Sequence, residues 1–345
     1  MTSSLPYVCP VCRTGFATPD GFACAGCGVR YPVIRGMPVL CPDPYRHLGE
    51  EALRIAEYRQ SNRAPGQAAG PDSMSLNDVC DRMTEAITPL LTVRSVLATA
   101  AARSAKRSRN PYSPVQSLYY LHRDWSGAPA CEEEIQDITQ AALKALDNAG
   151  GERSRILLLG AGTGRFASVL APHFASTHAM ELSVPMGLLR DFLRDGPLRF
   201  TALDRRNRRT EADARQQHTA TNLGADLDSV EWVIADALHS PYPDGYFTTV
   251  ASLYFSDVVP AGRLLPEVAR LLAPGGTFVH VGPLGYQFEA PADDIWPAER
   301  WPAEVEQFGL RAVHTDWVRS THHVDPSSMF TTLVDNFVLA CEKRA

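Results

Sequence analysis

A run of four apolar residues followed at once by a turn with three glycines is the feature that most constrains the fold. Ile156–Leu159 is short, apolar and bounded by turn signals, which predicts a buried strand. Gly160, Gly162 and Gly164 follow in the spacing G-x-G-x-G, and a helical pattern begins at Phe166. Glycines in this position allow a tight turn and a close approach of the backbone to a ligand. We therefore expect a strand, a bare ligand-binding turn and a helix in succession.

The segments after this turn alternate between strand and helix, which predicts an α/β fold. Parallel strands with helices on both faces are the usual product of such alternation. Because right-handed crossovers align the carboxyl ends of parallel strands, the glycine turn should lie at the ligand-binding edge of the sheet. His280, inside the last of these strands, is expected to be a core residue with satisfied hydrogen bonds. The expected strands are 178–182, 230–235, 248–254 and 277–281, and the expected helices are 166–174, 185–194 and 264–272.

Two C-x-x-C pairs near the N-terminus predict a metal site. Cys9, Cys12, Cys24 and Cys27 supply four thiolates, and eleven residues separate the pairs. Zinc prefers four soft ligands in a tetrahedron, and a site closed by four thiolates is structural. Four reduced cysteines without a metal are the alternative. The following segment, Tyr31–Leu40, resembles the end of the zinc-ribbon activator family, small modules that accompany methyltransferases.

The residues between the ribbon and the α/β segment are predicted to be mainly helical. Apolar residues recur at helical spacing, and a linker rich in glycine, proline and alanine occupies 64–71. Pro89 should break the second of the helical stretches, which are expected at 50–61, 75–108 and 113–149. The predicted organisation is therefore a zinc ribbon at 1–44, a helical cap region at 45–150 and a Rossmann-like α/β domain at 151–345.

Composition and charge limit the function classes. With 345 residues the chain is long enough for about two domains. Its net charge of −6 argues against a nucleic-acid partner and an anionic membrane surface. No stretch approaches the roughly 20 apolar residues that span a bilayer, and the first ten residues lack the pattern of a secretory signal. We expect a cytoplasmic protein.

An acidic residue at the end of the second predicted strand narrows the identity of the ligand. A carboxylate at Glu181 can accept hydrogen bonds from both hydroxyls of a ribose, whereas the glycine turn alone would also suit a dinucleotide. Together with the segments Asp236–Phe247 and Leu271–Val279, this pattern resembles Rossmann-type S-adenosylmethionine-dependent methyltransferases. The resemblance implies that Asp236 bonds the adenine amino group. The implied cofactor-binding residues are Arg123, Gly160, Gly162, Gly164, Glu181, Asp236, Ala237 and Leu253.

A narrower resemblance covers about residue 113 to the C-terminus. The pieces 123–126, 255–257, 282–289 and 320–329 are similar to the carnosine N-methyltransferase family. The resemblance implies that Arg123 contacts the cofactor carboxylate or closes the site. It also implies catalytic roles for Asp257, Gln287 and His322, with Asp257 facing the amine or imidazole of the substrate.

Departures from that family predict a different methyl acceptor. Gln287 stands where the family has a substrate-orienting histidine, and His322 stands where it has a tyrosine. The tyrosine cluster of the family is replaced here by 331–334. We therefore expect methyl transfer to nitrogen of a small metabolite or natural product that carries an imidazole or an amine.

Two other functions stay open at this point. An RNA methyltransferase could use the zinc ribbon to recognise ribosomal RNA, and a non-enzyme could use the ribbon for interaction on a degenerate fold. The ribbon also offers a surface for a protein partner or for self-association. The arginine-rich insertion at 203–223 is predicted to be a mobile, solvated loop, with a substrate lid as the alternative.

Overall fold

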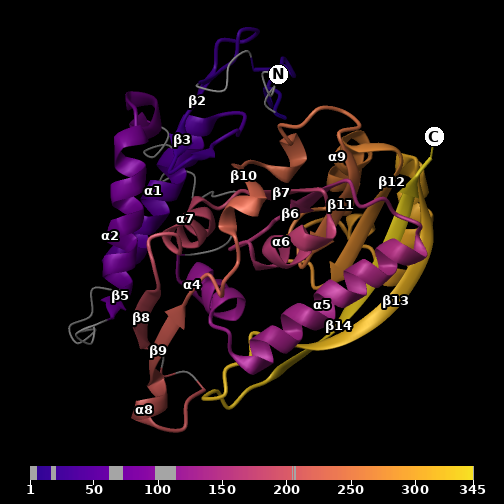
Figure 1. Ribbon diagram of the computed structural model, residues 1–345. Helices are drawn as coiled ribbons and strands as arrows, with labels where there is room; N and C mark the ends of the chain where they lie inside the picture. Colours follow the sequence, from indigo (N-terminus) through magenta and orange to yellow (C-terminus); the bar gives the residue numbers. More distant parts are fainter. Residues whose placement is uncertain are drawn as a thin grey trace.

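The computed structural model describes residues 6–16, 21–61, 73–97, 114–203, 205 and 207–344. A seven-stranded sheet lies at its centre, in the order β10-β7-β6-β11-β12-β14-β13 (Figure 1). The first five strands in this order are parallel, and β14 is antiparallel to both of its neighbours. The predicted parallel α/β sheet is confirmed, while the last two strands were not foreseen. The strands are β6 (Arg155–Leu159), β7 (Ser176–Glu181), β10 (Val230–Ile234), β11 (Phe247–Leu253), β12 (Leu272–Gly282), β13 (Leu310–His322) and β14 (Thr332–Lys343).

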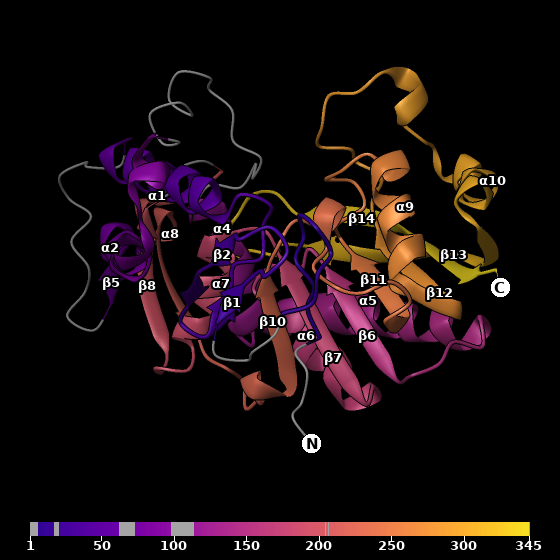
Figure 2. The same ribbon diagram turned by 90° about the horizontal axis from the view of Figure 1, so that it is seen from above.

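Helices cover both faces of this sheet, as the alternating pattern predicts. Successive side chains of β6 point to opposite faces, so Leu158 packs into one buried cluster with Ile138 of α5, while Leu157 packs into a second with Leu264 of α9. Figure 2 shows α5 and α9 on opposite sides of the sheet. The helices of this region are α5 (Pro129–Asn148), α6 (Arg165–Leu170), α7 (Val184–Phe192), α9 (Ala261–Leu271) and α10 (Trp301–Glu304).

A helical region and a small second sheet lie beside the edge of the main sheet (Figure 1). Helix α2 begins at a capping box between Ser75 and Asp78 and ends at Ile87, so the predicted break at Pro89 is confirmed. The predicted linker at 64–71 and the end of the 75–108 helix lie outside the described residues. The elements here are α1 (Pro44–Ser61), α2 (Leu76–Ile87), α4 (Pro114–Trp125), β5 (Met74–Ser75), β8 (Leu198–Leu203), α8 (Glu211–Ala214) and β9 (Arg215–Ala220).

Two predictions about single segments were wrong. The insertion at 203–223 is not a loop, because 215–220 forms β9 and pairs antiparallel with β8 over its whole length. His280 is fully buried as expected, and it stacks on Trp301 with 5.6 Å between ring centroids. However, neither of its ring nitrogens has a hydrogen-bond partner among the described residues. Burial lowers the pKa of His280 to about 4, so the ring stays neutral.

The ribbon packs directly against the edge of the main sheet. A parallel bridge joins Val39 to Ile234 of β10, and Tyr7 and Leu40 share a buried cluster with Val233. Its strands are β1 (Phe22–Ala23), β2 (Arg30–Tyr31), β3 (Val33–Ile34) and β4 (Met37–Pro38). The predicted domain boundaries stay predictions, since the ribbon shares its core with the sheet. None of the described helices is long and apolar enough to cross a bilayer.

Short 3-10 turns complete the described secondary structure. They are η1 (Thr88–Leu90), η2 (Ala171–His173), η3 (Leu227–Ser229), η4 (Ala237–His239), η5 (Ala292–Asp294), η6 (Ala298–Arg300) and η7 (Val305–Phe308).

Candidate functional site

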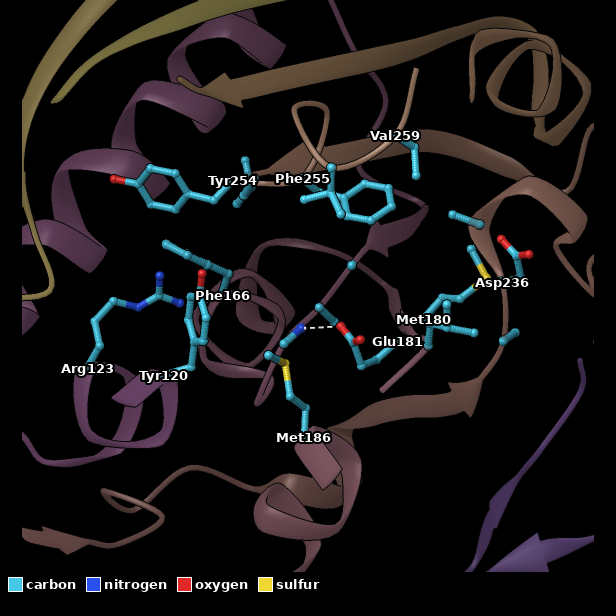
Figure 3. Close-up of a pocket in the computed structure, with 18 residues that line it drawn as sticks. Tyr120, Arg123, Phe166, Met180, Glu181, Met186, Asp236, Tyr254, Phe255 and Val259 are labelled. Carbon is cyan, nitrogen blue, oxygen red and sulfur yellow. Dashed lines mark hydrogen bonds between the residues drawn. The ribbon is translucent and has the colours of Figure 1, made fainter. Parts of the chain in front are cut away.

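A cavity lies at the carboxyl ends of the parallel strands, and we call it the main cavity. About 860 Å³ of space, including open solvent at its mouth, is free of protein atoms. Figure 3 shows side chains from several elements converging on it. It is lined by Tyr120, Arg123, Gly160, Ala161, Gly162, Phe166, Met180, Glu181, Leu182, Met186, Ala235, Asp236, Ala237, Leu253, Tyr254, Phe255, Val258 and Val259.

The glycine turn supplies bare backbone to the main cavity. Gly160, Gly162 and Gly164 have φ of +58°, +59° and +89°, a region that favours glycine. A Cβ at Gly162 would meet only the sulfur of Met186, at 3.9 Å, so the space in front of this residue is open. Gly164 does not line the cavity, and a Cβ there would lie 2.8 Å from the ring of Trp232. Gly160 and Gly162 therefore line the cavity, whereas Gly164 packs against the ring of Trp232.

The carboxylate of Glu181 points at the glycine turn. Its Oε2 accepts a hydrogen bond of 2.8 Å from the amide of Gly162 (Figure 3). Its Oε1 accepts one of 2.7 Å from the amide of Ser183. Desolvation by burial raises the pKa of Glu181 to about 7, although the two amides oppose this shift. A buried carboxylate beside bare backbone at a cavity wall is a suitable acceptor for ribose hydroxyls.

Helix α4 is hydrogen-bonded to the same turn through Asp124 and Trp125. The hydroxyl of Thr163 donates to Asp124 at 2.5 Å, and the indole of Trp125 donates to the carbonyl of Thr163 at 2.9 Å. Arg123 lines the cavity and is 4% exposed, and its Nε donates to Asp124 at 2.6 Å. Nη1 of Arg123 has no hydrogen-bond partner among the described residues. It lies 3.9 Å from Oε1 of Glu134, too far for a hydrogen bond, so it is a buried donor that an anionic group of a ligand could satisfy.

The remaining predicted cofactor residues close the far side of the main cavity. Asp236 and Ala237 follow β10, and Leu253 ends β11. Asp236 Oδ1 accepts a hydrogen bond from the amide of Leu238 at 2.9 Å, which begins the short turn η4. Apart from Gly164, every residue predicted to bind the cofactor lines one cavity.

The three predicted catalytic residues lie outside the lining of the main cavity. Asp257 is 4% exposed, and its Oδ2 accepts a hydrogen bond of 3.2 Å from Nε2 of Gln287. Burial raises the pKa of Asp257, while the Gln287 amide opposes the rise. His322 instead pairs with Glu134, with 2.8 Å between Nδ1 and Oε1. The structure therefore joins Asp257 to Gln287 and holds His322 in a separate contact.

Several aromatic residues that line the cavity were not predicted from the sequence. Tyr120, Phe166 and Tyr254 surround the guanidinium of Arg123, at 5.0, 5.3 and 5.7 Å from its Cζ to the ring centroids. Tyr254 directly follows β11, and Tyr120 precedes Arg123 by one helical turn. These positions relative to the strand end and to Arg123 could have predicted that both side chains line the cavity. Glu134 was also missed, because a buried acid on α5 resembles a solvent-facing charge in the sequence.

The four N-terminal cysteines are arranged as a metal site. Their Sγ atoms all lie within 4.8 Å of one another, and a zinc ion bound at about 2.3 Å sets tetrahedral edges of about 3.8 Å. The hydroxyl of Tyr31 lies 3.0 Å from Sγ of Cys9, where it can orient a thiolate. The donor set and its spacing fit a structural zinc ion, which the residues Cys9, Cys12, Cys24 and Cys27 would hold.

The ribbon also braces the segment that closes the main cavity. Arg13, on the first cysteine turn, donates to the carbonyls of Ser240 and Tyr242 at 2.7 and 3.2 Å. The amide of Leu40 donates to the carbonyl of Ile234 at 2.8 Å, two residues before Asp236. Both ends of the 236–242 segment are thus held by the ribbon.

Comparisons with known proteins identify a domain within the chain. Residues 186–280 match the methyltransferase domain family. No curated protein matches the chain. A SAM-dependent methyltransferase from Aquifex aeolicus is 14% identical over 67% of this chain and 99% of that chain, with a TM-score of 0.43. A putative sarcosine dimethylglycine methyltransferase from Galdieria sulphuraria is 13% identical over 66% and 98%, with a TM-score of 0.42.

A third similar structure is a complex of a Haloferax volcanii methyltransferase activator with a putative methyltransferase. It is 14% identical over 63% of this chain and 96% of that chain, with a TM-score of 0.39. At such TM-scores these likenesses carry no argument about substrate or partner. The chain has the Rossmann-like methyltransferase fold, and the domain match supports S-adenosylmethionine-dependent methyltransferase activity. The resemblances to the carnosine N-methyltransferase and zinc-ribbon activator families stay predictions.

Replacing one exposed thiolate should remove the metal. We expect Cys12→Ser to reduce bound zinc from about one per chain to nearly none and to lower the melting temperature, because zinc binding contributes directly to folding. Elemental analysis and thermal melts measure both effects. Cys80→Ser, in α2 and outside the cluster, should keep its zinc. Retention of a full zinc equivalent by Cys12→Ser would refute the four-thiolate site.

Breaking the link between α4 and the glycine turn should destabilise the protein. Thr163→Val removes the donor to the buried carboxyl group of Asp124, and we expect a loss of about 1–3 kcal/mol in the free energy of unfolding. Denaturant unfolding measures this loss. Thr219→Val, at an exposed position of β9, is the matched control and should change stability by less than about 0.5 kcal/mol. Equal losses in the two variants would contradict a specific role of the contact.

Proposed function

We propose that this protein transfers a methyl group from S-adenosylmethionine to a nitrogen of a small molecule that carries an imidazole or an amine. The observation that supports it most is that Glu181, the open backbone at Gly162 and Arg123 line one cavity, and that Nη1 of Arg123 has no hydrogen-bond partner among the described residues. Glu181 is suited to the ribose hydroxyls, the open backbone at Gly162 allows the nucleoside to approach closely, and Arg123 is suited to the carboxylate of the cofactor. The residues present therefore fit the cofactor.

Each cofactor role follows from the position of a residue in the cavity. Glu181 would accept the ribose hydroxyls, and Asp236 would lie near the adenine, with Ala237 and Leu253 as apolar walls. Arg123 would pair with the carboxylate, which would supply the hydrogen bond that its Nη1 lacks among the described residues. The cofactor supplies an activated methyl group on a sulfonium, so little covalent chemistry is required of the protein.

On the acceptor side, the chain must orient a neutral nitrogen and exclude water. Asp257 would hold an N–H of the acceptor and stabilise the positive charge that develops on its nitrogen. Gln287 keeps the carboxyl group in one orientation through its 3.2 Å hydrogen bond. His322 would contribute its Nε2, since its Nδ1 is held by Glu134.

The ionisation of Glu181 should control cofactor affinity. Protonation below about pH 7 removes the charge from the acceptor of the ribose hydroxyls, so we expect affinity to rise between pH 6 and pH 8. Glu181→Gln should bind S-adenosylhomocysteine about 10- to 100-fold more weakly and lose this pH dependence. Calorimetric titration of the full chain measures both. Glu231→Gln, on the exposed side of β10, is the control. Unchanged affinity of Glu181→Gln would overturn the cofactor assignment.

Asp257 should affect turnover rather than cofactor binding. We expect Asp257→Asn to lower kcat for a methyl acceptor by about 100-fold and to leave the affinity for S-adenosylhomocysteine within about twofold. Transfer of a labelled methyl group to imidazole- and amine-containing compounds measures kcat. An unchanged kcat would remove Asp257 from the proposed acceptor site, and methylation of RNA in place of these compounds would replace the small-molecule proposal.

A further inference from the structure

Two consecutive aromatic residues, Tyr254 and Phe255, line the main cavity directly after β11. Successive side chains of an extended strand point to opposite faces, so a straight strand would direct only one of the two rings into the cavity. The backbone turns here instead, because Tyr254 has a φ of +55°, in the left-handed region. Figure 3 shows Tyr254, Phe255 and Val259 in a row along one wall of the cavity.

The left-handed conformation of Tyr254 is held by its neighbours. Its amide donates to the carbonyl of Val281 at 3.0 Å, and its hydroxyl lies 3.1 Å from that of Ser320. A Cβ at Gly282 would lie 3.1 Å from the amide nitrogen of Tyr254, so glycine at this position makes room for the turn. A bulky residue in this region is strained, and such strain persists where the surrounding contacts fix it. The strained turn directs the next side chain, Phe255, into the cavity.

The ring of Phe255 lies directly against the glycine turn. A Cβ added to Gly160 would come within 2.1 Å of a carbon of this ring, so glycine is needed beneath it. The guanidinium of Arg123 lies over the rings of Tyr120, Phe166 and Tyr254, and Phe255 is not among the rings that it contacts. Because Phe255 is half-buried and lines the cavity, part of its ring is open to a ligand.

The place of Phe255 suits the sulfur of the proposed cofactor. Glu181 is assigned to the ribose and Arg123 to the carboxylate, and the sulfur of the cofactor lies between these two parts. Phe255 packs on Gly160, at the start of the turn whose Gly162 amide donates to Glu181. The sulfur of S-adenosylmethionine carries a positive charge, whereas that of the product, S-adenosylhomocysteine, is neutral. An aromatic face attracts a cation through its ring quadrupole and gives a neutral thioether no such attraction.

We propose that Phe255 is a specificity-determining residue for the cofactor, whose ring recognises the charged sulfonium in preference to the neutral thioether of the product. This inference rests on the proposed function and adds to it a residue that distinguishes the cofactor before methyl transfer from the product after it. The acids that line the cavity, Glu181 and Asp236, are already assigned to the ribose and the adenine. The ring therefore supplies the attraction for the charge on sulfur, and its loss on methyl transfer weakens the hold on the product.

The affinities for two ligands that differ by the charged methyl group test this inference. S-adenosylmethionine and S-adenosylhomocysteine are titrated separately at pH 8 into the full chain, and calorimetry gives both dissociation constants. We expect Phe255→Leu to shift their ratio about 3- to 30-fold against S-adenosylmethionine, because leucine keeps an apolar contact and removes the ring. Phe255→Tyr keeps an aromatic face and should keep the ratio. Phe308→Leu, at a half-buried ring in η7 outside the cavity lining, is the matched control.

The outcomes separate this inference from the function on which it rests. If neither ligand binds the unaltered protein, the proposed function itself fails. With binding intact, an equal loss of affinity for both ligands in Phe255→Leu would mean that the ring only packs on Gly160, and it would overturn the inference alone. A shift as large in Phe255→Tyr as in Phe255→Leu would also overturn it. If Phe255→Leu fails to fold, Phe255→Met serves in its place with the same expectation.

Discussion

The hydrogen bond between the amide of Gly162 and the carboxylate of Glu181 is the contact on which the rest of the structure depends. It joins the end of β6 to the end of β7 and fixes where the main cavity lies. Gly162 keeps the backbone open there at a positive φ, and the buried side chain of Glu181 reaches its amide. The contact is made at the cost of a desolvated carboxylate, which a ligand with hydroxyl donors would stabilise.

Two parts of the chain brace this edge of the sheet from opposite directions. Helix α4 holds the glycine turn through Asp124 and Trp125, and the ribbon holds the 236–242 segment through Arg13. Both braces use hydrogen bonds to backbone or hydroxyl groups, and Arg13 adds an exposed ion pair with Asp244. The hydrogen bonds of the buried α4 brace are screened little by salt, whereas the exposed ion pair is screened more. A zinc ion held by the four cysteines, next to the turn that carries Arg13, would stabilise the geometry of one wall from outside the cavity.

The parts of the site that the sequence could predict are those with a local signature. The glycine spacing, the strand-end position of Glu181 and the paired cysteines depend on neighbours in the chain, and the structure places them as expected except for Gly164. What escaped prediction depends on contacts between distant segments. Strand β9 was hidden by its polar sequence, RQQHTA, because its alternation is visible only when β8 is known to pair with it.

Glu134 connects the proposed acceptor side of the site to Arg123 of the main cavity. Its side chain is fully buried, accepts from Nδ1 of His322 and from the amide of His323, and lies 3.9 Å from Nη1 of Arg123. Glu134 thus orients His322, whose ring lies beside that of Tyr254, and it also lies next to the guanidinium of Arg123. A ligand anion that takes up Nη1 of Arg123 would weaken the hold of that guanidinium on Glu134, and Glu134 would then bind His322 more strongly. Occupation of the main cavity would in this way affect the orientation of the His322 ring, which is proposed to lie on the acceptor side.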